Sequence, residues 1–340
     1  MLRRRARGYR PSLLLVVALL AGCGSPGGST PAATSPASSP TATAKAEQPS
    51  PPSETAAITG LTGHVVFARA GGKYGDETTF VMNIDGSDLH QIGEDAQSGF
   101  PWATADGSHI VVGREEGGRL GASIFDLSGA TSFDVPEPSD LMFGSAPFTP
   151  DEKFLVAETF TSPGFAYQAT NVVEIATGKM RKLVDDKHYI SGDVSPDGKQ
   201  VLLFLNDPTV DPPAPGSLWV IGLDGKGLRE VTTSGHIVQC CMSYRWSPDG
   251  TSLLFAGPEG GLWTIGVDGS NLTELFHQDG KWAITPTYSP DGSMIMFALD
   301  PSANPFLHPP NALYVIRADG SGLTLVLESD YFKREPLWLP

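Results

Sequence analysis

Two neighbouring cysteines form the most unusual chemical feature of the chain. Cys240 and Cys241 lie in segment 236–242, whose sequence is HIVQCCM. Adjacent α-carbons are closer together than the usual span of a disulfide, so a bond between these two thiols requires a distorted peptide. Two other interpretations stay open, a pair of inert thiols or a soft-metal site shared with His236 and Met242. We favour the disulfide and expect no metal.

The third cysteine, Cys23, belongs to a targeting sequence. Five arginines stand among the first ten residues, and the apolar stretch 13–20 that follows is too short to span a bilayer stably. Leu-Ala-Gly-Cys at 20–23 then matches the bacterial lipobox, in which cleavage leaves the cysteine as a lipidated N-terminus. We therefore predict that residues 1–22 are a lipoprotein signal peptide. Acylated (palmitate-bearing) Cys23 would hold the protein at the extracytoplasmic face of the cell membrane.

Residues 23–58 consist mainly of Ser, Thr, Pro and Ala, with almost no large apolar side chain. Such a segment cannot bury enough surface to order itself, so we predict a disordered tether. The signal peptide holds five arginines and no acidic residue, so its removal takes the formal charge from -15 to about -20. This charge repels phosphate backbones, and we expect no nucleic-acid partner. Aspartates within 185–211 could hold calcium, but the spacing of calcium loops is absent.

The sequence contains no recognisable catalytic signature. Gly-x-Ser-x-Gly, His-Glu-x-x-His and a phosphate-binding loop are all absent, and the seven histidines are scattered along the chain. We therefore predict a protein that is not an enzyme and that uses no cofactor.

One turn sequence recurs along the chain and must position any site. Ser-Pro-Asp-Gly occupies 195–198, 247–250 and 289–292, and altered copies occupy 104–107 and 149–152. Proline, aspartate and glycine each favour one position of a tight turn. An apolar run of strand character follows every copy. Successive copies begin 42 to 52 residues apart, which indicates a repeat architecture.

A second repeated sequence alternates with the first. Apolar runs such as Leu218–Ile221 and Leu262–Ile265 precede an Asp-Gly pair, and further apolar residues follow. Asp-Gly between apolar runs is a strong hairpin signal. Together the two sequences define six units of four strands each over about 280 residues.

This combination resembles the TolB-type propeller repeat. The likeness covers 60–340 and is weaker in the second and third units, where Ala105 and Glu152 take the places of proline and glycine. The resemblance implies an all-β fold, a six-bladed propeller over 59–340, which we expect to be monomeric. The C-terminal residues 335–340 imitate the first strand of a blade, so we predict that Trp338 lies beside the strand 64–69 and that both termini complete one blade.

In such a ring the tight turns share one rim and the longer loops share the other. Ligand sites favour long loops on a rigid frame, so we expect the site at the long-loop rim, around the mouth of the central channel. The candidate ligand-binding residues are His188, Asp193, His236, Tyr244, Arg245 and Trp282.

Two functions remain open at this rim. We favour a non-enzymatic lipoprotein that binds a protein or a glycan of the cell envelope, as the resemblance implies. The alternative is a propeller enzyme, a polysaccharide lyase or hydrolase, that uses His188, His236 or Arg245. An enzyme should show a deep pocket with converging histidine, arginine and carboxylate groups. A scaffold should show a shallow or apolar-lined rim.

Overall fold

The computed structural model describes most of the repeat region. Its described residues are 60–70, 77–93, 101–116, 119–143, 146–161, 167–184, 189–205, 216–232, 244–257, 260–300, 312–328 and 332–340. Cys23, His188, His236, Cys240 and Cys241 lie outside them, so the predictions about these residues remain predictions. Among the described residues there is no helix with the length and apolar character needed to span a membrane.

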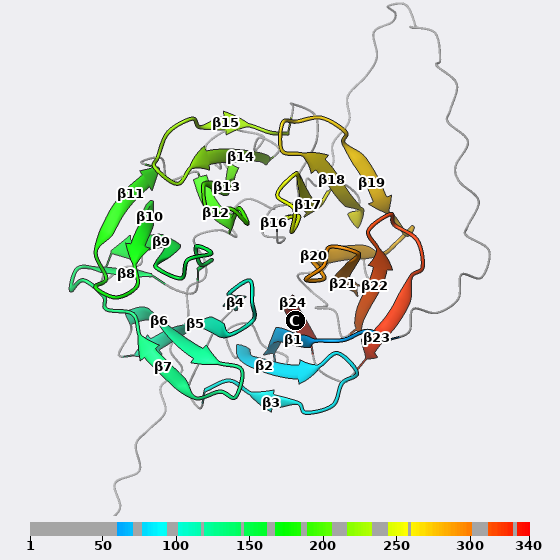
Figure 1. Cartoon of the computed structure of the whole chain (residues 1–340), viewed down its shortest axis with the longest axis horizontal. Helices are drawn as coiled ribbons and strands as arrows, with labels where there is room; N and C mark the ends of the chain where they lie inside the picture. The colour runs from blue at the N-terminus through cyan, green and yellow to red at the C-terminus, as the bar shows by residue number, and fades with distance from the viewer. Residues whose placement is uncertain are drawn as a thin grey trace, which may run out of the picture. The chain divides into compact units, whose positions relative to one another are not determined.

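Six four-stranded antiparallel sheets surround a common centre (Figure 1). We number these blades from 1 to 6 in chain order and give their strands from the innermost outward. Blade 1 contains β24 (Phe332–Leu339), β1 (His64–Ala70), β2 (Glu77–Asn83) and β3 (His90–Gln91). Blade 2 contains β4 (Trp102–Ala103), β5 (His109–Glu116), β6 (Arg119–Asp126) and β7 (Thr131–Asp134). Blade 3 contains β8 (Leu141–Phe143), β9 (Phe154–Thr161), β10 (Tyr167–Glu174) and β11 (Met180–Val184).

The other three blades follow the same order. Blade 4 contains β12 (Tyr189–Val194), β13 (Gln200–Leu205), β14 (Ser217–Gly222) and β15 (Arg229–Glu230). Blade 5 contains β16 (Tyr244–Trp246), β17 (Ser252–Ala256), β18 (Leu262–Gly266) and β19 (Thr273–Phe276). Blade 6 contains β20 (Trp282–Tyr288), β21 (Met294–Asp300), β22 (Ala312–Arg317) and β23 (Thr324–Glu328). The predicted six-bladed propeller is therefore confirmed.

Both termini of the described ring complete blade 1. Strand β24 pairs with β1 in antiparallel register, with Trp338 opposite Val65. The Trp338 indole nitrogen also donates a hydrogen bond of 3.0 Å to the carbonyl of Thr62. The predicted position of Trp338 is confirmed, and the pairing leaves β1 without an open edge.

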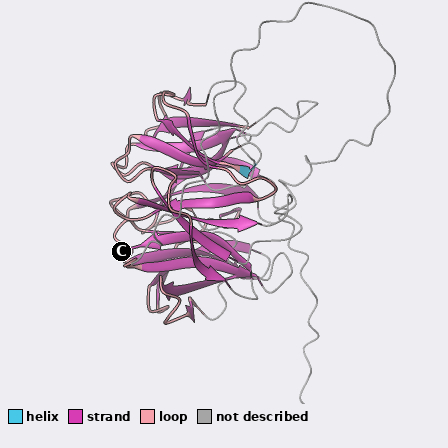
Figure 2. Ribbon diagram, turned by 90° about the vertical axis from the view of Figure 1, so that its right-hand side faces the viewer, coloured by secondary structure: helices cyan, strands magenta, loops and turns pink. Residues whose placement is uncertain are grey.

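The Ser-Pro-Asp-Gly turns adopt the conformation that their residues favour. In the turn at 195–198 the Ser195 hydroxyl donates to Asp197 over 2.8 Å, and the Lys199 amide donates to the same carboxylate oxygen over 3.0 Å. Gly198 has φ +72°, in the region that glycine enters without steric cost. In blade 3, where glutamate replaces this glycine, Glu152 still takes φ +56°. Figure 2 shows the blades edge-on, with most described turns along the left side.

The core lies between successive blades, around the second strand of each. Phe67, Phe204, Phe255 and Phe297, on β1, β13, β17 and β21, are at most 2% exposed. A strand in this position has sheet neighbours on both sides and other blades on both faces, so nearly all its side chains are apolar. These packed strands form the rigid frame that carries the loops and the channel lining.

Candidate functional site

The described residues of the predicted rim all lie on innermost strands. Asp193 is on β12, Tyr244 and Arg245 are on β16, and Trp282 begins β20. Tyr244 stacks on Phe204, with ring centroids 5.0 Å apart, so it takes part in packing. Trp282 is half-buried at the edge of an apolar cluster. Only Asp193 and Arg245 among these four belong to one group of charges.

Arg245 crosses the centre of the ring. Blade 5, which carries it, lies opposite blade 2, and β16, β4 and β24 surround the central region in Figure 1. The guanidinium carbon of Arg245 lies 4.1 Å from the centroid of the Trp102 ring, on β4 of blade 2. A guanidinium over an indole face at this distance gains cation–π attraction. Arg245 therefore joins opposite sides of the propeller.

A carboxylate of blade 1 completes this contact. Nη2 of Arg245 lies 3.8 Å from Oε2 of Glu335, and the two side chains are only 9% and 7% exposed. Opposite charges that are both removed from water attract strongly, but each also loses its hydration. Both charged groups are therefore largely shielded from solvent.

Asp193 and Glu158 are carboxyl groups with raised pKa values. Burial raises the pKa of Asp193 to about 6, although the charge of Arg245 and hydrogen bonds from the amides of Trp246 and Val194 oppose the shift. Burial likewise raises the pKa of Glu158 to about 7, against hydrogen bonds from the amide and hydroxyl of Ser191. Shifted carboxyl groups beside an arginine occur in catalytic sites and in structural ion networks alike.

Two innermost strands have strained backbones. Thr285 on β20 has φ +50° and Glu335 on β24 has φ +48°, and each lies at an irregularity in strand pairing. Positive φ is rare for a β-branched residue such as threonine. Within the described part of the chain, the buried Thr285 hydroxyl and the Nε atom of Arg245 make no hydrogen bond. The channel lining is therefore both strained and incompletely paired.

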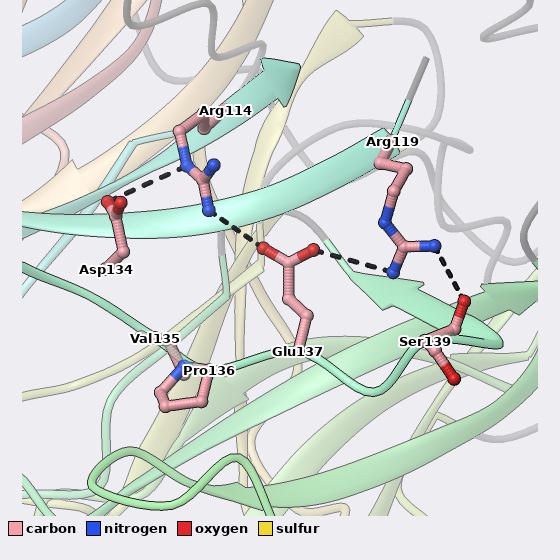
Figure 3. A pocket seen from close by; sticks show the side chains of 7 residues that line it. All are labelled: Arg114, Arg119, Asp134, Val135, Pro136, Glu137 and Ser139. Carbon is pink, nitrogen blue, oxygen red and sulfur yellow. Dashed lines mark hydrogen bonds and ion pairs between the residues drawn. The ribbon is translucent and has the colours of Figure 1, made fainter. Parts of the chain in front are cut away.

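A separate pocket opens between blades 2 and 3. Its volume is about 570 Å³, and its lining comes from the end of β5, the start of β6, the end of β7 and the following loop. These segments lie at the long-loop rim, since the tight turns of blade 2 lie at the other ends of the same strands. The lining residues are Arg114, Arg119, Asp134, Val135, Pro136, Glu137 and Ser139 (Figure 3).

Charged side chains alternate in sign along one wall of this pocket. Nε of Arg114 lies 3.7 Å from Oδ1 of Asp134, and Nη2 of Arg114 lies 3.0 Å from Oε1 of Glu137. The other oxygen of Glu137 lies 3.9 Å from Nη2 of Arg119. The row Asp134, Arg114, Glu137, Arg119 carries no net formal charge, and Figure 3 shows its members side by side.

The backbone fixes this row in place. Arg119 donates hydrogen bonds of 2.7 to 3.1 Å to the carbonyls of Pro138, Ser139 and Leu141, which clamp the connection to blade 3. Gly121 leaves room for the Glu137 carboxylate, because a β-carbon at position 121 would lie 1.8 Å from its Oε1. Three hydrogen bonds therefore hold Arg119 in the wall, and the position of Glu137 depends on one glycine.

None of the pocket residues was among the predicted site residues. The pocket lies at the predicted rim but away from the channel residues Asp193 and Arg245. Two arginines flanking the tip of the β5–β6 hairpin were the signal that could have drawn attention to it. Among the described residues, no group of three or more histidine, cysteine or acidic side chains has the geometry to hold a metal ion.

Comparison with solved structures shows the same fold. TolB from Acinetobacter baumannii is similar with a TM-score of 0.60 and 17% identity, over 82% of this chain and 67% of that chain. A protein described as a TolB of Agrobacterium tumefaciens gives 0.59 and 16%, over 83% and 100%. A puromycin hydrolase complexed with PGG gives 0.54 and 19%, over 79% and 46%. No family model matches the sequence, and no curated protein matches it.

Proposed function

We propose that this protein is a membrane-anchored binding or scaffold lipoprotein whose propeller takes a protein or a cell-envelope glycan at its long-loop rim. The observation that carries this proposal is the open pocket of about 570 Å³ between blades 2 and 3. It combines charged groups with a rigid frame at the rim where ligands are expected.

Three further observations support the proposal. The fold is that of TolB proteins, although similarity at this level of identity concerns fold alone. The lipobox at Cys23 gives a route to an anchor, with a monomeric propeller held outside the cytoplasm on the 23–58 tether. The net charge of -15 argues against nucleic acid as the partner.

Crosslinking and pull-down of the lipidated chain from its own membrane tests the proposal. We expect one discrete partner, whose recovery falls when Asp134→Lys alters the pocket wall and stays unchanged in the matched rim variant Glu328→Lys. A Cys23→Ser chain should leave the membrane fraction. Recovery of no discrete partner by the wild-type chain would contradict the proposal, and equal recovery by both lysine variants would contradict binding at this pocket.

A second candidate function is a propeller enzyme, a polysaccharide lyase or hydrolase. The observation in its favour is the group formed by Arg245 with Asp193 and Glu335, since arginine beside a carboxyl group of raised pKa suits proton transfer. Against it, the side chains of Arg245 and Glu335 are only 9% and 7% exposed. Release of soluble glycan fragments by the purified chain, abolished in Arg245→Gln, would favour this alternative.

A further inference from the structure

The charged pocket between blades 2 and 3 has a wall that selects for a particular charge distribution. The more exposed acid and the more exposed base stand at opposite ends of the row. Among the acids, Asp134 keeps 55% of its side chain exposed and Glu137 keeps 12%, and among the bases Arg119 keeps 33% and Arg114 keeps 28%. A ligand in the pocket therefore meets a negative group at one end and a positive group at the other.

A ligand with one charge suits this wall poorly. An anion near Arg119 also approaches the Glu137 carboxylate, 3.9 Å from the guanidinium. A cation near Asp134 meets Arg114 in the same way, at 3.7 Å. Like charges at such distances in a partly buried site offset much of the attraction. A ligand that carries a positive and a negative group complements both ends at once.

The size of the pocket fits a short chain molecule. Its volume of about 570 Å³ falls within the usual range of small-ligand pockets, roughly 300 to 1,000 Å³. A peptide of three extended residues is roughly 10 Å long, which is small enough for a pocket of this volume. The exposed Pro136 adds apolar surface to the pocket, and the exposed Ser139 adds a hydroxyl group.

We propose that this pocket binds a short peptide with both termini free, its ammonium group at Asp134 and its carboxylate at Arg119. The wall is preorganised for such a ligand, because Arg119 is clamped by three carbonyls and Glu137 is seated over Gly121. This assignment names a ligand for the proposed binding function. It rests on the proposed function only in that both place the ligand at the long-loop rim.

Calorimetric titration of the detergent-solubilised full chain with tri-alanine tests this assignment. We expect saturable binding by the wild-type chain. N-acetylated tri-alanine should bind at least tenfold more weakly, the ratio expected when one charge-assisted hydrogen bond is lost. C-amidated tri-alanine lacks the carboxylate that Arg119 would bind, so it should also bind at least tenfold more weakly than tri-alanine. Because both modified peptides are titrated into the unaltered chain, these results do not depend on a variant's folding.

Two matched variants locate the site. Asp134→Asn keeps an oxygen that can accept the 2.6 Å hydrogen bond from Ser123 but removes the charge, and should weaken tri-alanine binding at least tenfold. Glu328→Gln alters an exposed carboxylate at the same end of an outermost strand, β23, and should leave affinity unchanged. No binding at roughly 10 mM tri-alanine, far weaker than specific recognition, would overturn the assignment. Equal affinity of Asp134→Asn, or of the acetylated peptide, would also overturn it.

This experiment separates the two proposals. A failed titration beside a successful pull-down would reject the peptide and keep the binding function. A successful titration beside a failed pull-down would keep the pocket's ligand and reject a stable macromolecular partner.

Discussion

Arg245 and Trp102 meet across the centre of the propeller, with the guanidinium carbon 4.1 Å from the centroid of the indole ring. The two residues belong to opposite blades, and Glu335 of blade 1 adds its carboxylate 3.8 Å from the same guanidinium. Three blades that share no sheet hydrogen bonds are thereby joined at the axis. This contact should stabilise the ring as a whole, in addition to the packing between neighbouring blades.

Replacing Arg245 by alanine should therefore destabilise the fold. Removing one partner of a buried ion pair leaves the other charge in a poorly solvated site, and the cost is about 3 kcal/mol or more. Chemical denaturation measures the free energy of unfolding. Lys226→Ala, which removes an 84% exposed charge that also pairs with a carboxylate, should change it by less than about 0.5 kcal/mol. A similarly small change in Arg245→Ala would show that the contact across the axis contributes nothing.

Glu158 should make stability depend on pH. Its pKa is raised from 4.5 to about 7, so between these values the folded chain keeps a proton that the unfolded chain has released. Glu158 therefore makes its full contribution to the free energy of unfolding below pH 4.5, and this contribution is lost as the pH rises towards 7.

Urea unfolding at several pH values measures this dependence. Glu158→Gln should show a shallower fall in the free energy of unfolding between pH 4.5 and 7 than the wild-type chain. Some fall should remain, because burial also raises the pKa of Asp193. The exposed variant Glu328→Gln should keep the wild-type profile. Identical profiles for Glu158→Gln and wild type would exclude Glu158 as the source.

Gly121→Ala should disturb the pocket wall. The added β-carbon would lie 1.8 Å from Oε1 of Glu137 and 2.9 Å from Nη2 of Arg114, so the ion pair must shift. Overpacking of this kind costs about 1 to 3 kcal/mol. In a double-mutant cycle, Glu137→Ala should cost less in the Gly121→Ala background than in the wild-type chain. Strictly additive losses would mean that Glu137 does not occupy the space above Gly121.

The repeat and the ring closure were predictable because their causes are local. Ser195 to Gly198 form the same turn as their later copies, since each residue favours one position of it. The match between 335–340 and the first strands of other blades predicted the pairing of Trp338 with the N-terminal strand. Glu152 shows a limit, because this glutamate keeps the positive φ of the glycine that it replaces.

The sites were less predictable because they depend on contacts between distant strands. Asp193 and Arg245 were chosen for their place near the channel, but Trp102 and Glu335 were missed as partners. Which side chain reaches across a ring depends on rotamers and on strand irregularities, and no spacing in the sequence reports these. The row from Asp134 to Arg119 likewise forms only when β5, β6 and β7 align.

Trp338 offers the sharpest test of ring closure. It is 7% exposed, pairs with Val65 and donates to the Thr62 carbonyl, so truncation removes both packing and a hydrogen bond. Trp338→Ala should lower the free energy of unfolding by about 3 to 5 kcal/mol. Trp338→Phe keeps most of the packing and should cost about 1 to 2 kcal/mol. Hydrogen exchange should show lost protection in β1 and β24 together, since each covers the other's edge. Loss confined to β24, with β1 still protected, would mean that the N-terminal strand is stable without its C-terminal partner.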